Sequence, residues 1–348
     1  MKHAPADNFP QLDQLDRLVD ERRARRAQGF PSAPRDAAVH AAQLAPTVFH
    51  ERWWLDIASE GRWAEARIEK GGKLIARLPY MLVRNKMGQK MLRAPAMTNV
   101  LGPAFSPDLA ADTATRSLKT FTVVQELVAQ LPHASHAWFR MHRAMLNTLG
   151  FEAAGFASTL DFTTEIAPQP TDALWKQMRD KTRNVIRRAE EKLTVTDRID
   201  ADTFLDHYEA NLAEKGEANE RPRPICRALI EESVRRNAGR ILAARDEDGQ
   251  IHAAIFTVWN GEQEHYLMST RTPRGHNGAV PLLIWEAVQK ASAAGRVFDT
   301  DGIKAHSNIT LITGFGGTIR PRLAVTRGTL GYQALQLANS VMGRKRAY

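Results

Sequence analysis

The sequence predicts an α/β protein built from two similar domains in tandem. The chain has 348 residues, which is long for one domain and comfortable for two. Hydrophobic residues make up 43% and charged residues 25%, the balance of a globular protein with a core. Both halves follow one order of elements: a hairpin, a helix, a strand, a Gly-Phe turn and a final strand. This repetition indicates an internal duplication.

A hairpin opens the first half. Two apolar-rich stretches flank Gly71-Gly72, a pair that favours a tight turn between strands. A long helix is expected next, because Leu118, Phe121, Val124 and Leu127 recur at helical spacing. The elements predicted for this half are strands over 63–69, 74–83, 137–141 and 158–162 and a helix over 111–131.

The second half repeats this order. Its hairpin turns at Asp248-Gly249, and its helix ends at Gly295, a residue typical of the position after a helix. The segment Gly314-Phe315-Gly316-Gly317 then leads into the last strand. The elements predicted here are strands over 241–245, 251–259, 265–270, 297–301 and 323–326 and a helix over 280–294.

A basic helix is predicted between the halves, over about residues 172–193. Its apolar residues recur at helical spacing from Leu174 to Leu193, which indicates one buried face. A second face carries cations three or four residues apart. These cations either lie in solvent or form a clamp for phosphate or carboxylate groups. They are Lys176, Arg179, Arg183 and Arg187, with Lys181, Arg188 and Lys192 beside them.

The composition of the chain indicates which ligands it favours and in which cellular compartment it is expected. The formal net charge of +9 and the pI near 9.8 favour anionic ligands: nucleotide phosphates, coenzyme A, tRNA or an anionic membrane surface. The one cysteine, Cys226, excludes an intramolecular disulfide and suits a reducing compartment. The first residues lack the apolar stretch of a secretory signal, and no apolar run is long enough to cross a bilayer. We therefore expect a cytoplasmic protein without a membrane span.

An N-terminal basic arm is predicted over residues 1–46. A helix over 12–27 would carry the run Arg22-Arg23-Ala24-Arg25-Arg26 at its end. Such an arm either binds nucleic acid or lipid head groups, or its cations complement the dipole of their own helix.

Several segments resemble the Fem-type transferases and their GNAT-like relatives. Their order and spacing extend over residues 45–330. In the first half they are Phe49-His50, Trp53-Trp54-Leu55, Leu78-Pro79-Tyr80, Pro95 and Thr98-Asn99-Val100-Leu101-Gly102-Pro103. In the second half they are Leu174-Trp175-Lys176, Arg183-Asn184-Val185-Ile186-Arg187-Arg188-Ala189-Glu190, Phe298-Asp299-Thr300-Asp301-Gly302 and Gly314-Phe315-Gly316-Gly317.

The resemblance implies two tandem GNAT-type domains, each a mixed, splayed sheet flanked by helices. The first would cover residues 47–165 and the second, starting with the basic helix, residues 166–320. It also implies that residues 321–348 return to pack on the first domain.

An N-acyltransferase or aminoacyltransferase is the activity that the resemblance implies. Family members move an aminoacyl group from tRNA, or an acyl group from a thioester, onto an amine. The donor substrate would be acyl-CoA or aminoacyl-tRNA, and no tightly bound cofactor is expected. The acceptor would be a small molecule or precursor with an amine, in cell-envelope or natural-product biosynthesis.

The sequence departs from the family pattern at one position. Fem-type enzymes carry a lysine in Phe-Lys-x-x-Phe-Gly before the glycine pair, and Ile312 occupies that position here. Lys304 lies nearby in sequence, but the match does not transfer the role to it. This departure favours an alternative function, a catalytically inactive GNAT duplicate that binds an anionic ligand or nucleic acid.

The donor is expected to bind the second domain. In GNAT folds the splayed strand, here residues 265–270, offers backbone N–H groups to the developing oxyanion, and the next helix N-terminus binds pyrophosphate. Residues 274–279 match the phosphate loop Arg/Gln-x-x-Gly-x-Gly/Ala with one residue too many, so an ordinary glycine-rich turn is an equal alternative. The predicted donor-binding residues are Ser269, Thr270, Arg274, Gly275, Asn277, Gly278, Ala279, Phe315 and Gly316.

Three residues are candidates for proton transfer. Asp299 and Asp301, at the end of a central strand, are predicted to remove or orient the amine proton. Alternatively, Asp301-Gly302 makes a turn and Asp299 is buried with a partner. Tyr266 is predicted to protonate the leaving group, unless it belongs to the core.

The acceptor is assigned to the start of the first domain and to the basic helix. Its predicted contacts are Trp53, Trp54, Lys181, Arg183 and Arg187, although at least one tryptophan could belong to the core. No metal is expected, because His50, His265 and His276 lack metal-ligand spacing. The sequence also lacks a Gly-x-Ser-x-Gly elbow and a Walker motif, which excludes the serine-hydrolase and P-loop classes.

Overall fold

The computed structural model describes residues 44–110, 112–302 and 306–334. All of them belong to one compact unit that spans residues 41–348. The helix predicted over residues 12–27, most of the predicted basic arm and Lys304 lie outside the described residues. None of the described helices is long and apolar enough to cross a membrane.

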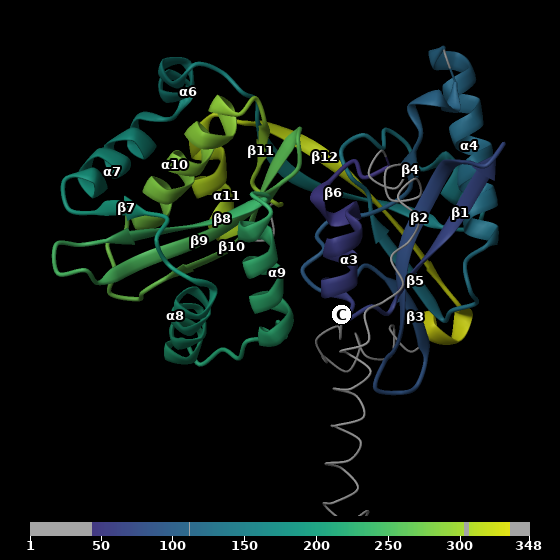
Figure 1. The fold of residues 1–348 in the computed structure, drawn as a ribbon, viewed down its shortest axis with the longest axis horizontal. Coiled ribbons are helices and arrows are strands. Elements are labelled where there is room, and N and C mark those ends of the chain that lie inside the picture. The colour runs from purple at the N-terminus through teal and green to yellow at the C-terminus, as the bar shows by residue number, and fades with distance from the viewer. Residues whose placement is uncertain (1–43, 111, 303–305, 335–348) are drawn as a thin grey trace, which may run out of the picture. The chain divides into compact units, whose positions relative to one another are not determined.

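The first half contains the predicted hairpin, which follows two short helices (Figure 1). Its two strands turn at Gly71 and Gly72, whose φ angles of 57° and 75° explain the need for glycine. The elements of this half are η1 (Val48–His50), α3 (Arg52–Ala58), β1 (Trp63–Lys70), β2 (Lys73–Arg84), β3 (Lys90–Arg93), β4 (Ala104–Phe105), η2 (Pro107–Leu109), α4 (Thr113–Ala129), β5 (His136–Arg140), α5 (Leu149–Ala153) and β6 (Ala157–Ile166).

The second half contains the predicted strands and helix and two helices, α8 and α9, that the sequence analysis did not assign. Its elements are α6 (Thr171–Gln177), α7 (Asp180–Glu190), β7 (Thr194–Thr196), α8 (Ala201–Glu214), α9 (Arg223–Arg235), β8 (Gly239–Arg245), β9 (Ile251–Trp259), β10 (Gln263–Arg271), α10 (Ala279–Ala293), β11 (Val297–Asp299), α11 (His306–Ile312), η3 (Thr313–Phe315) and β12 (Thr318–Gly328).

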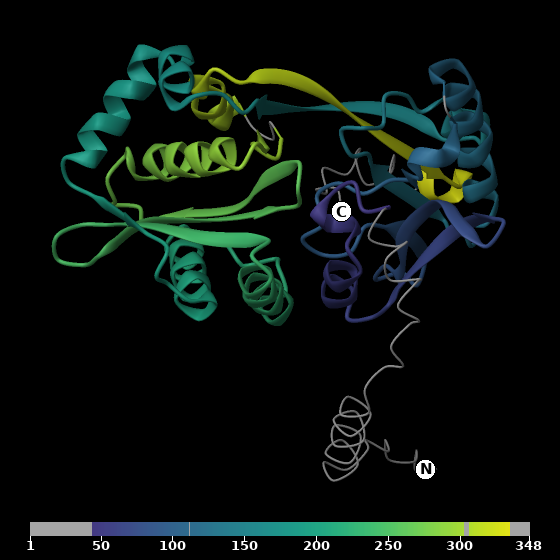
Figure 2. The same cartoon turned by 45° about the horizontal axis from the view of Figure 1, so that its top comes forward.

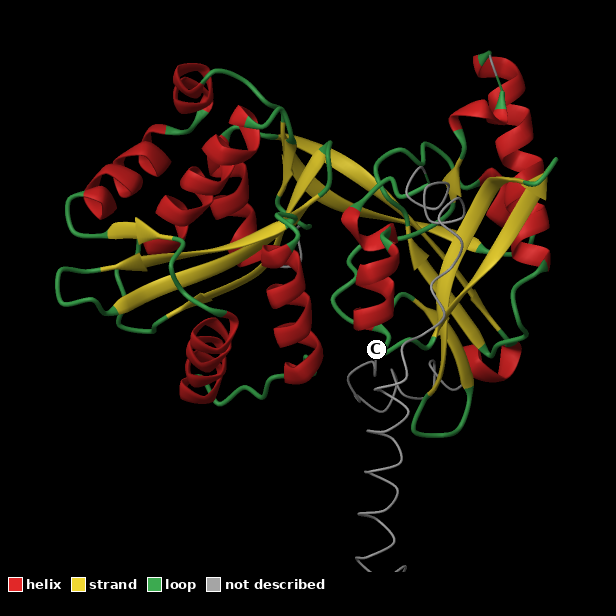
Figure 3. Ribbon diagram, viewed as in Figure 1, coloured by secondary structure: helices red, strands yellow, loops and turns green. Residues whose placement is uncertain are grey.

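The described strands form one mixed sheet that runs through both halves (Figure 3). Its order is β1-β2-β3-β5-β12-β6-β11-β10-β9-β8-β7, and β4 pairs with β2. β12, the last strand of the chain, lies between β5 and β6 of the first half and is antiparallel to both. β11 pairs with the end of β6, so the two halves meet at β6, β11 and β12.

Helices cover both faces of the strands in the second half (Figures 1 and 2). α7 and α10 pack on one face, in a core that contains Phe298 and Phe315. α8 and α9 pack on the other face around Phe204 and Phe256, and residues 48–58 of the first half join this core. A third core, around Phe139 and Phe151, belongs to the first half. The arrangement is the predicted α/β class, with a mixed sheet flanked by helices.

The basic segment is two helices and not one. α6 ends at Gln177 and α7 starts at Asp180, with Met178 and Arg179 in extended conformation between them. The prediction of one helix over 172–193 was therefore wrong. The break has a long-range cause, because the Arg179 N–H donates to the Gly314 carbonyl at 3.0 Å instead of to its own helix.

Candidate active site

β10 changes its pairing at mid-length. On one side it is antiparallel to β9 up to Arg271, with a register shift between Tyr266 and Met268. On the other side it is parallel to β11 through Gln263, Glu264 and His265 alone. The two strands separate after His265, and residues 266–271 of β10 have no strand partner on that side in the described part of the chain. We call these residues the splay edge.

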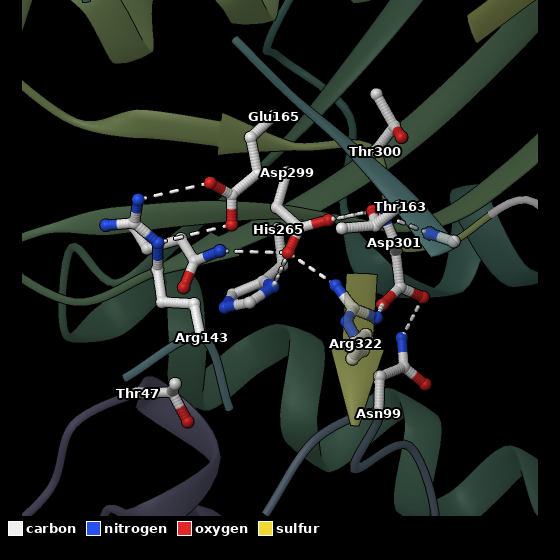
Figure 4. Close-up of polar contacts among 12 residues, drawn as sticks. Thr47, Asn99, Arg143, Thr163, Glu165, His265, Asp299, Thr300, Asp301 and Arg322 are labelled. Atoms are coloured by element: carbon white, nitrogen blue, oxygen red, sulfur yellow. Dashed lines mark hydrogen bonds and ion pairs between the residues drawn. The ribbon is translucent and has the colours of Figure 1, made fainter. Parts of the chain in front are cut away.

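A buried polar cluster lies beside the point of separation (Figure 4). Asp299 ends β11 and is 1% exposed. Its carboxylate accepts hydrogen bonds from Thr163 Oγ1 at 2.5 Å and from Gln263 Nε2 at 2.9 Å. It also accepts the Asp301 N–H at 2.8 Å and pairs with Arg322 of β12 at 2.5 Å. We call these five residues, together with His265, the Asp299 cluster.

Asp299 is held as an anion by this cluster. Burial raises the pKa of its carboxyl, but the Arg322 charge and the hydrogen bonds from Thr163 and from the Asp301 N–H outweigh that effect and leave the pKa below its ordinary value. A carboxylate with this pKa and four donors is a weak base at neutral pH. The geometry favours the alternative stated for the sequence, in which Asp299 is buried with a partner.

Asp301 connects this cluster to the first half. Its φ of 63° lies in the left-handed region and Gly302 follows with a φ of 103°, so the pair makes the turn that was the alternative to a catalytic role. The Asp301 carboxylate accepts from the Asn99 amide and lies 3.5 Å from an Arg322 nitrogen. Because Asn99 follows β3, these contacts tie the end of β11 to the first half.

His265 is the unusual member of the cluster. It is 1% exposed, and its ring lies 4.8 Å from the ring of Phe49. Neither ring nitrogen has a hydrogen-bond partner in the described structure, and Nδ1 is 3.7 Å from an Asp299 oxygen. Burial lowers the pKa of His265 to about 4, so the imidazole is neutral at pH 7. The sequence analysis had treated this residue as an isolated histidine.

Tyr266 and Ser269 lie on the splay edge itself. Tyr266 is partly buried against the core of α7 and α10. Burial raises the pKa of its hydroxyl to about 12, although a hydrogen bond with Ser269 opposes the shift. Ser269 is exposed. The Thr270 hydroxyl instead accepts from Asn211 of α8 at 2.7 Å, so this predicted donor-binding side chain is engaged with α8.

The loop before α10 is closed and not open to a pyrophosphate. The Gly278 N–H donates to the His276 ring at 3.0 Å, and the Ala279 N–H donates to the His276 carbonyl at 3.0 Å. Pro281 has no N–H, which leaves Val280 as the one free donor among these first helical positions in the described chain. One free N–H group therefore remains at this helix end, and pyrophosphate binding there stays a prediction.

Packing of α7 explains this closure. A Cβ on Gly278 would lie 2.6 Å from the Val185 carbonyl oxygen and 2.9 Å from the Ala189 Cβ, so α7 lies directly on the loop. Asn277 accepts from Arg271 at 3.0 Å, and a Cβ on Gly275 would lie 2.8 Å from the His252 carbonyl oxygen. Of the predicted loop residues, Arg274 remains exposed beside this packed turn.

The glycine-rich segment after α11 packs in the break between α6 and α7. Phe315 is 1% exposed in the core. Gly316 has a φ of 77°, and a Cβ there would lie 2.4 Å from the Gln177 carbonyl oxygen. The two residues predicted to bind donor therefore have packing contacts. Ile312, at the position of the Fem-type lysine, is 3% exposed and apolar.

The predicted acceptor residues divide into buried and exposed groups. Trp54 is fully buried and donates to Thr98 at 3.0 Å, so it is a core residue and its assignment to the acceptor was wrong. Trp53 is partly buried, with the Arg236 guanidinium 5.2 Å from its ring centre. Lys181 and Arg187 are exposed on α7.

Arg183 is occupied within the basic segment. One of its nitrogens donates to the carbonyls of Lys176 at 3.0 Å and Met178 at 2.9 Å, at the end of α6. A second nitrogen pairs with Asp180. A cation at a helix C-terminus satisfies carbonyls that have no partner inside the helix. Arg183 therefore stabilises the break, and its assignment to the acceptor stays a prediction.

Comparisons with known proteins agree with this geometry. Residues 176–302 match the family model of an acetyltransferase (GNAT) domain. The fold is shared with FemX at a TM-score of 0.63 and 10% identity, covering 88% of this chain and 98% of that chain. No curated protein sequence matches.

Two further solved structures share the fold. One is the C-terminal domain of a putative lysylphosphatidylglycerol synthetase from Agrobacterium fabrum, with a TM-score of 0.55, 13% identity and coverage of 88% of this chain and 95% of that chain. The other is L-PGS from Bacillus licheniformis, with a TM-score of 0.54, 12% identity and coverage of 91% and 99%. Residues 176–302 therefore match a GNAT domain, and the chain shares the fold of FemX and of these two proteins.

Proposed function

We propose that this chain transfers an acyl or aminoacyl group from an activated donor to an amine. The observation that carries the proposal is the splay edge of β10, which lies within the GNAT domain match. Backbone N–H groups without a strand partner are fixed donors, and they can stabilise a carbonyl oxygen that becomes negative during the reaction. An acyl donor lying along residues 266–271 would meet these groups.

The proposed reaction needs little more than alignment and one proton transfer. The neutral amine nitrogen of the acceptor attacks the carbonyl carbon of the donor and forms the C–N bond. The C–S or C–O bond to the leaving group then breaks, and the proton lost by the amine balances the proton gained by the leaving group. With a pKa of about 12, Tyr266 keeps its hydroxyl proton at neutral pH and is the proposed proton donor to the leaving group.

The Asp299 cluster has a positioning role in this proposal. It holds the last paired residues of β10 and β11 together, because Gln263 and Asp299 bond directly at the start of the separation. A buried, fully paired carboxylate fixes where the strands part, and the splay edge begins one residue beyond His265. We propose no proton transfer through Asp299 or Asp301.

The donor is proposed to be an acyl-CoA or another thioester, with aminoacyl-tRNA as the second candidate. Lys192 lies close enough to His276 to lower the pKa of that imidazole, after the larger effect of burial, so a cation stands near the start of α10. Lys181 and Arg187, exposed on α7, are the proposed contacts for tRNA or for an anionic acceptor. We further propose a cytoplasmic location, and an acceptor from cell-envelope or natural-product biosynthesis.

A second candidate function has its own support. The apolar, buried Ile312 and the closed loop before α10 favour an inactive GNAT duplicate that binds an anionic ligand or nucleic acid. Such a protein would bind a donor or tRNA without turnover.

Binding of the donor can be tested by thermal unfolding with acetyl-CoA, a longer acyl-CoA and aminoacyl-tRNA. A donor present at a hundred times its Kd adds about 2.7 kcal/mol to the free energy of unfolding. We expect one of the three to raise Tm, and Ser269→Trp to abolish the rise because the indole would fill the exposed side of the splay edge.

Thr159→Trp is the matched control, since Thr159 is an exposed strand residue of β6 and its variant should keep the full shift. A shift without transfer to any amine would support the inactive duplicate. If none of the donors raises Tm in the wild type, or if Ser269→Trp keeps the shift, the proposed donor site is wrong.

A further inference from the structure

A pocket of about 620 Å³ lies away from the splay edge. Six stretches of the chain line it: residues 44–46, Glu51 before α3, Phe105, one face of α4, residues 142 and 144–147, and the turn between β9 and β10. The α4 face contributes Thr113, Arg116, Ser117 and Thr120, which are spaced as neighbours on a helix. Phe105 and Met145 add apolar surface.

The Glu51 carboxylate is a hydrogen-bond acceptor in this pocket that no donor in the described structure engages. The residue precedes α3 at its N-cap position, yet its side chain makes no capping hydrogen bond. No hydrogen bond or ion pair engages its carboxylate in the described structure, although it is partly buried. Burial raises its pKa despite the opposing effects of Arg77 and Arg236. Its carboxylate can therefore accept hydrogen bonds from a ligand in the pocket.

His142 supplies a second acceptor of the same kind. It is 4% exposed, and its Nε2 lies 2.9 Å from the Pro103 carbonyl oxygen, so Nε2 carries the proton of the neutral ring. The lone pair is then on Nδ1, which has no partner in the described chain. Burial lowers the pKa of His142 to about 4, so the ring remains neutral and Nδ1 remains an acceptor at pH 7.

Two of the side chains that line the pocket have their donors engaged. Arg116 donates to the carbonyls of Pro107 and Ala110. The Asn260 amide donates to the Pro46 carbonyl at 3.0 Å, and its oxygen accepts the Glu262 N–H at 3.2 Å. Glu51 and Glu262 are the acidic side chains among the described residues that line the pocket, and no hydrogen bond or ion pair engages either carboxylate there.

We propose that this pocket, the Glu51 pocket, binds a ligand through a primary ammonium group held by the Glu51 carboxylate. An ammonium group has three donors and no acceptor, so it complements both Glu51 and His142 Nδ1. The apolar surface of Phe105 and Met145 accommodates the carbon chain attached to it. The preference for a cation is opposite to that expected from the net charge of +9.

This is a second site and does not rest on the proposed transferase reaction. Glu262 precedes β10, and Leu267, where the register shifts, lies five residues further on. At about 3.4 Å per residue in a strand, Glu262 and Leu267, near the start of the splay edge, are roughly 17 Å apart along β10. Binding in the Glu51 pocket can therefore be measured without donor or turnover.

The test uses pentylamine as the probe and N-acetylpentylamine, which has no positive charge, as the comparison. Affinities are measured by ligand-observed NMR titration of the full chain. We expect pentylamine to bind and the acetylated compound not to bind. Glu51→Gln removes the charge at constant shape, and loss of one charge-assisted hydrogen bond should weaken pentylamine binding about tenfold or more.

Two further variants make the result specific. Glu126→Gln, on an exposed position of the same helix α4 but outside the pocket, should bind pentylamine as the wild type does. Ser117→Trp fills the pocket from an exposed position that tolerates size, and it should abolish binding with Tm unchanged. The proposal is overturned if Glu51→Gln stays within twofold of the wild type, if Ser117→Trp still binds, or if N-acetylpentylamine binds equally well.

Discussion

Replacing Arg322 with leucine is expected to destabilise the protein by about 3–5 kcal/mol, the usual cost of breaking a buried ion pair by removing one partner. Asp299 and Asp301 are 1% and 5% exposed, and both face this guanidinium. Without it, two carboxylates remain buried near the neutral ring of His265. Thermal or urea unfolding of the variant measures the loss, and a fall in Tm of several degrees or more is expected.

Arg320→Leu is the matched control. Arg320 is two residues away on the same strand, but its side chain is 59% exposed and 4.0 Å from Glu165. Exposed pairs of this kind contribute about 0–1 kcal/mol. If both variants lose the same amount, or if neither loses stability, the Asp299 cluster does not hold the halves together.

The pH dependence of the stability lost in Arg322→Leu provides an independent check of the ion pair with Asp299. In the wild type, the folded pKa of Asp299 is lowered, so its contribution is present above the ordinary pKa of an aspartate and is lost as pH falls through the lowered value. In the variant, burial without the cation raises that pKa. The stability difference between the two proteins should therefore shrink as the pH becomes acidic.

Replacing Tyr266 with phenylalanine is expected to lower kcat about a hundredfold or more, the typical contribution of a positioned proton donor. The change removes one hydroxyl whose pKa is about 12 and keeps the ring that packs against the core. Stability and donor affinity should therefore remain those of the wild type. Release of free thiol from the donor, in the presence of a panel of primary amines, measures the rate.

Tyr80→Phe provides the matching control for this variant. Tyr80 is a partly buried tyrosine of β2, and burial also raises its pKa, but it lies in the first half. Its variant should turn over at the wild-type rate. A Tyr266→Phe protein that keeps most of its kcat would show that the hydroxyl does not donate the proton.

Local patterns were sufficient to predict most of the fold. The glycine pair at Gly71-Gly72 and the apolar spacing of α4 and α10 depend on neighbours in sequence, and the structure confirms these elements. The prediction of one continuous basic helix was wrong, because the break in it depends on a residue distant in sequence. Its break depends on Gly314, more than a hundred residues later, and no local signal at Met178 and Arg179 reports that contact.

The candidate site was predictable in part. Asp299 was placed at the end of a strand, and burial with a partner was one of the two alternatives. The partner of Asp299 is Arg322, on a strand that returns to the first half of the sheet. This pairing depends on the sheet topology, which the spacing of residues in the sequence does not reveal. The strand-like stretch before Leu323 contains two arginines, Arg320 and Arg322, and nothing in the sequence shows which of them pairs with Asp299. For His265, the sequence holds no sign that both ring nitrogens lack partners.

Hydrogen exchange of the β10 amides, measured with and without donor, tests the proposed donor site most directly. We propose that the donor binds along residues 266–271 through those backbone N–H groups that point away from β9. Addition of acetyl-CoA, a longer acyl-CoA or aminoacyl-tRNA should slow exchange at residues 266–271 for at least one donor, while β5 (His136–Arg140), which is paired on both sides, should not change. Unaltered exchange at residues 266–271 with all three donors, or protection confined to the first half, would contradict it.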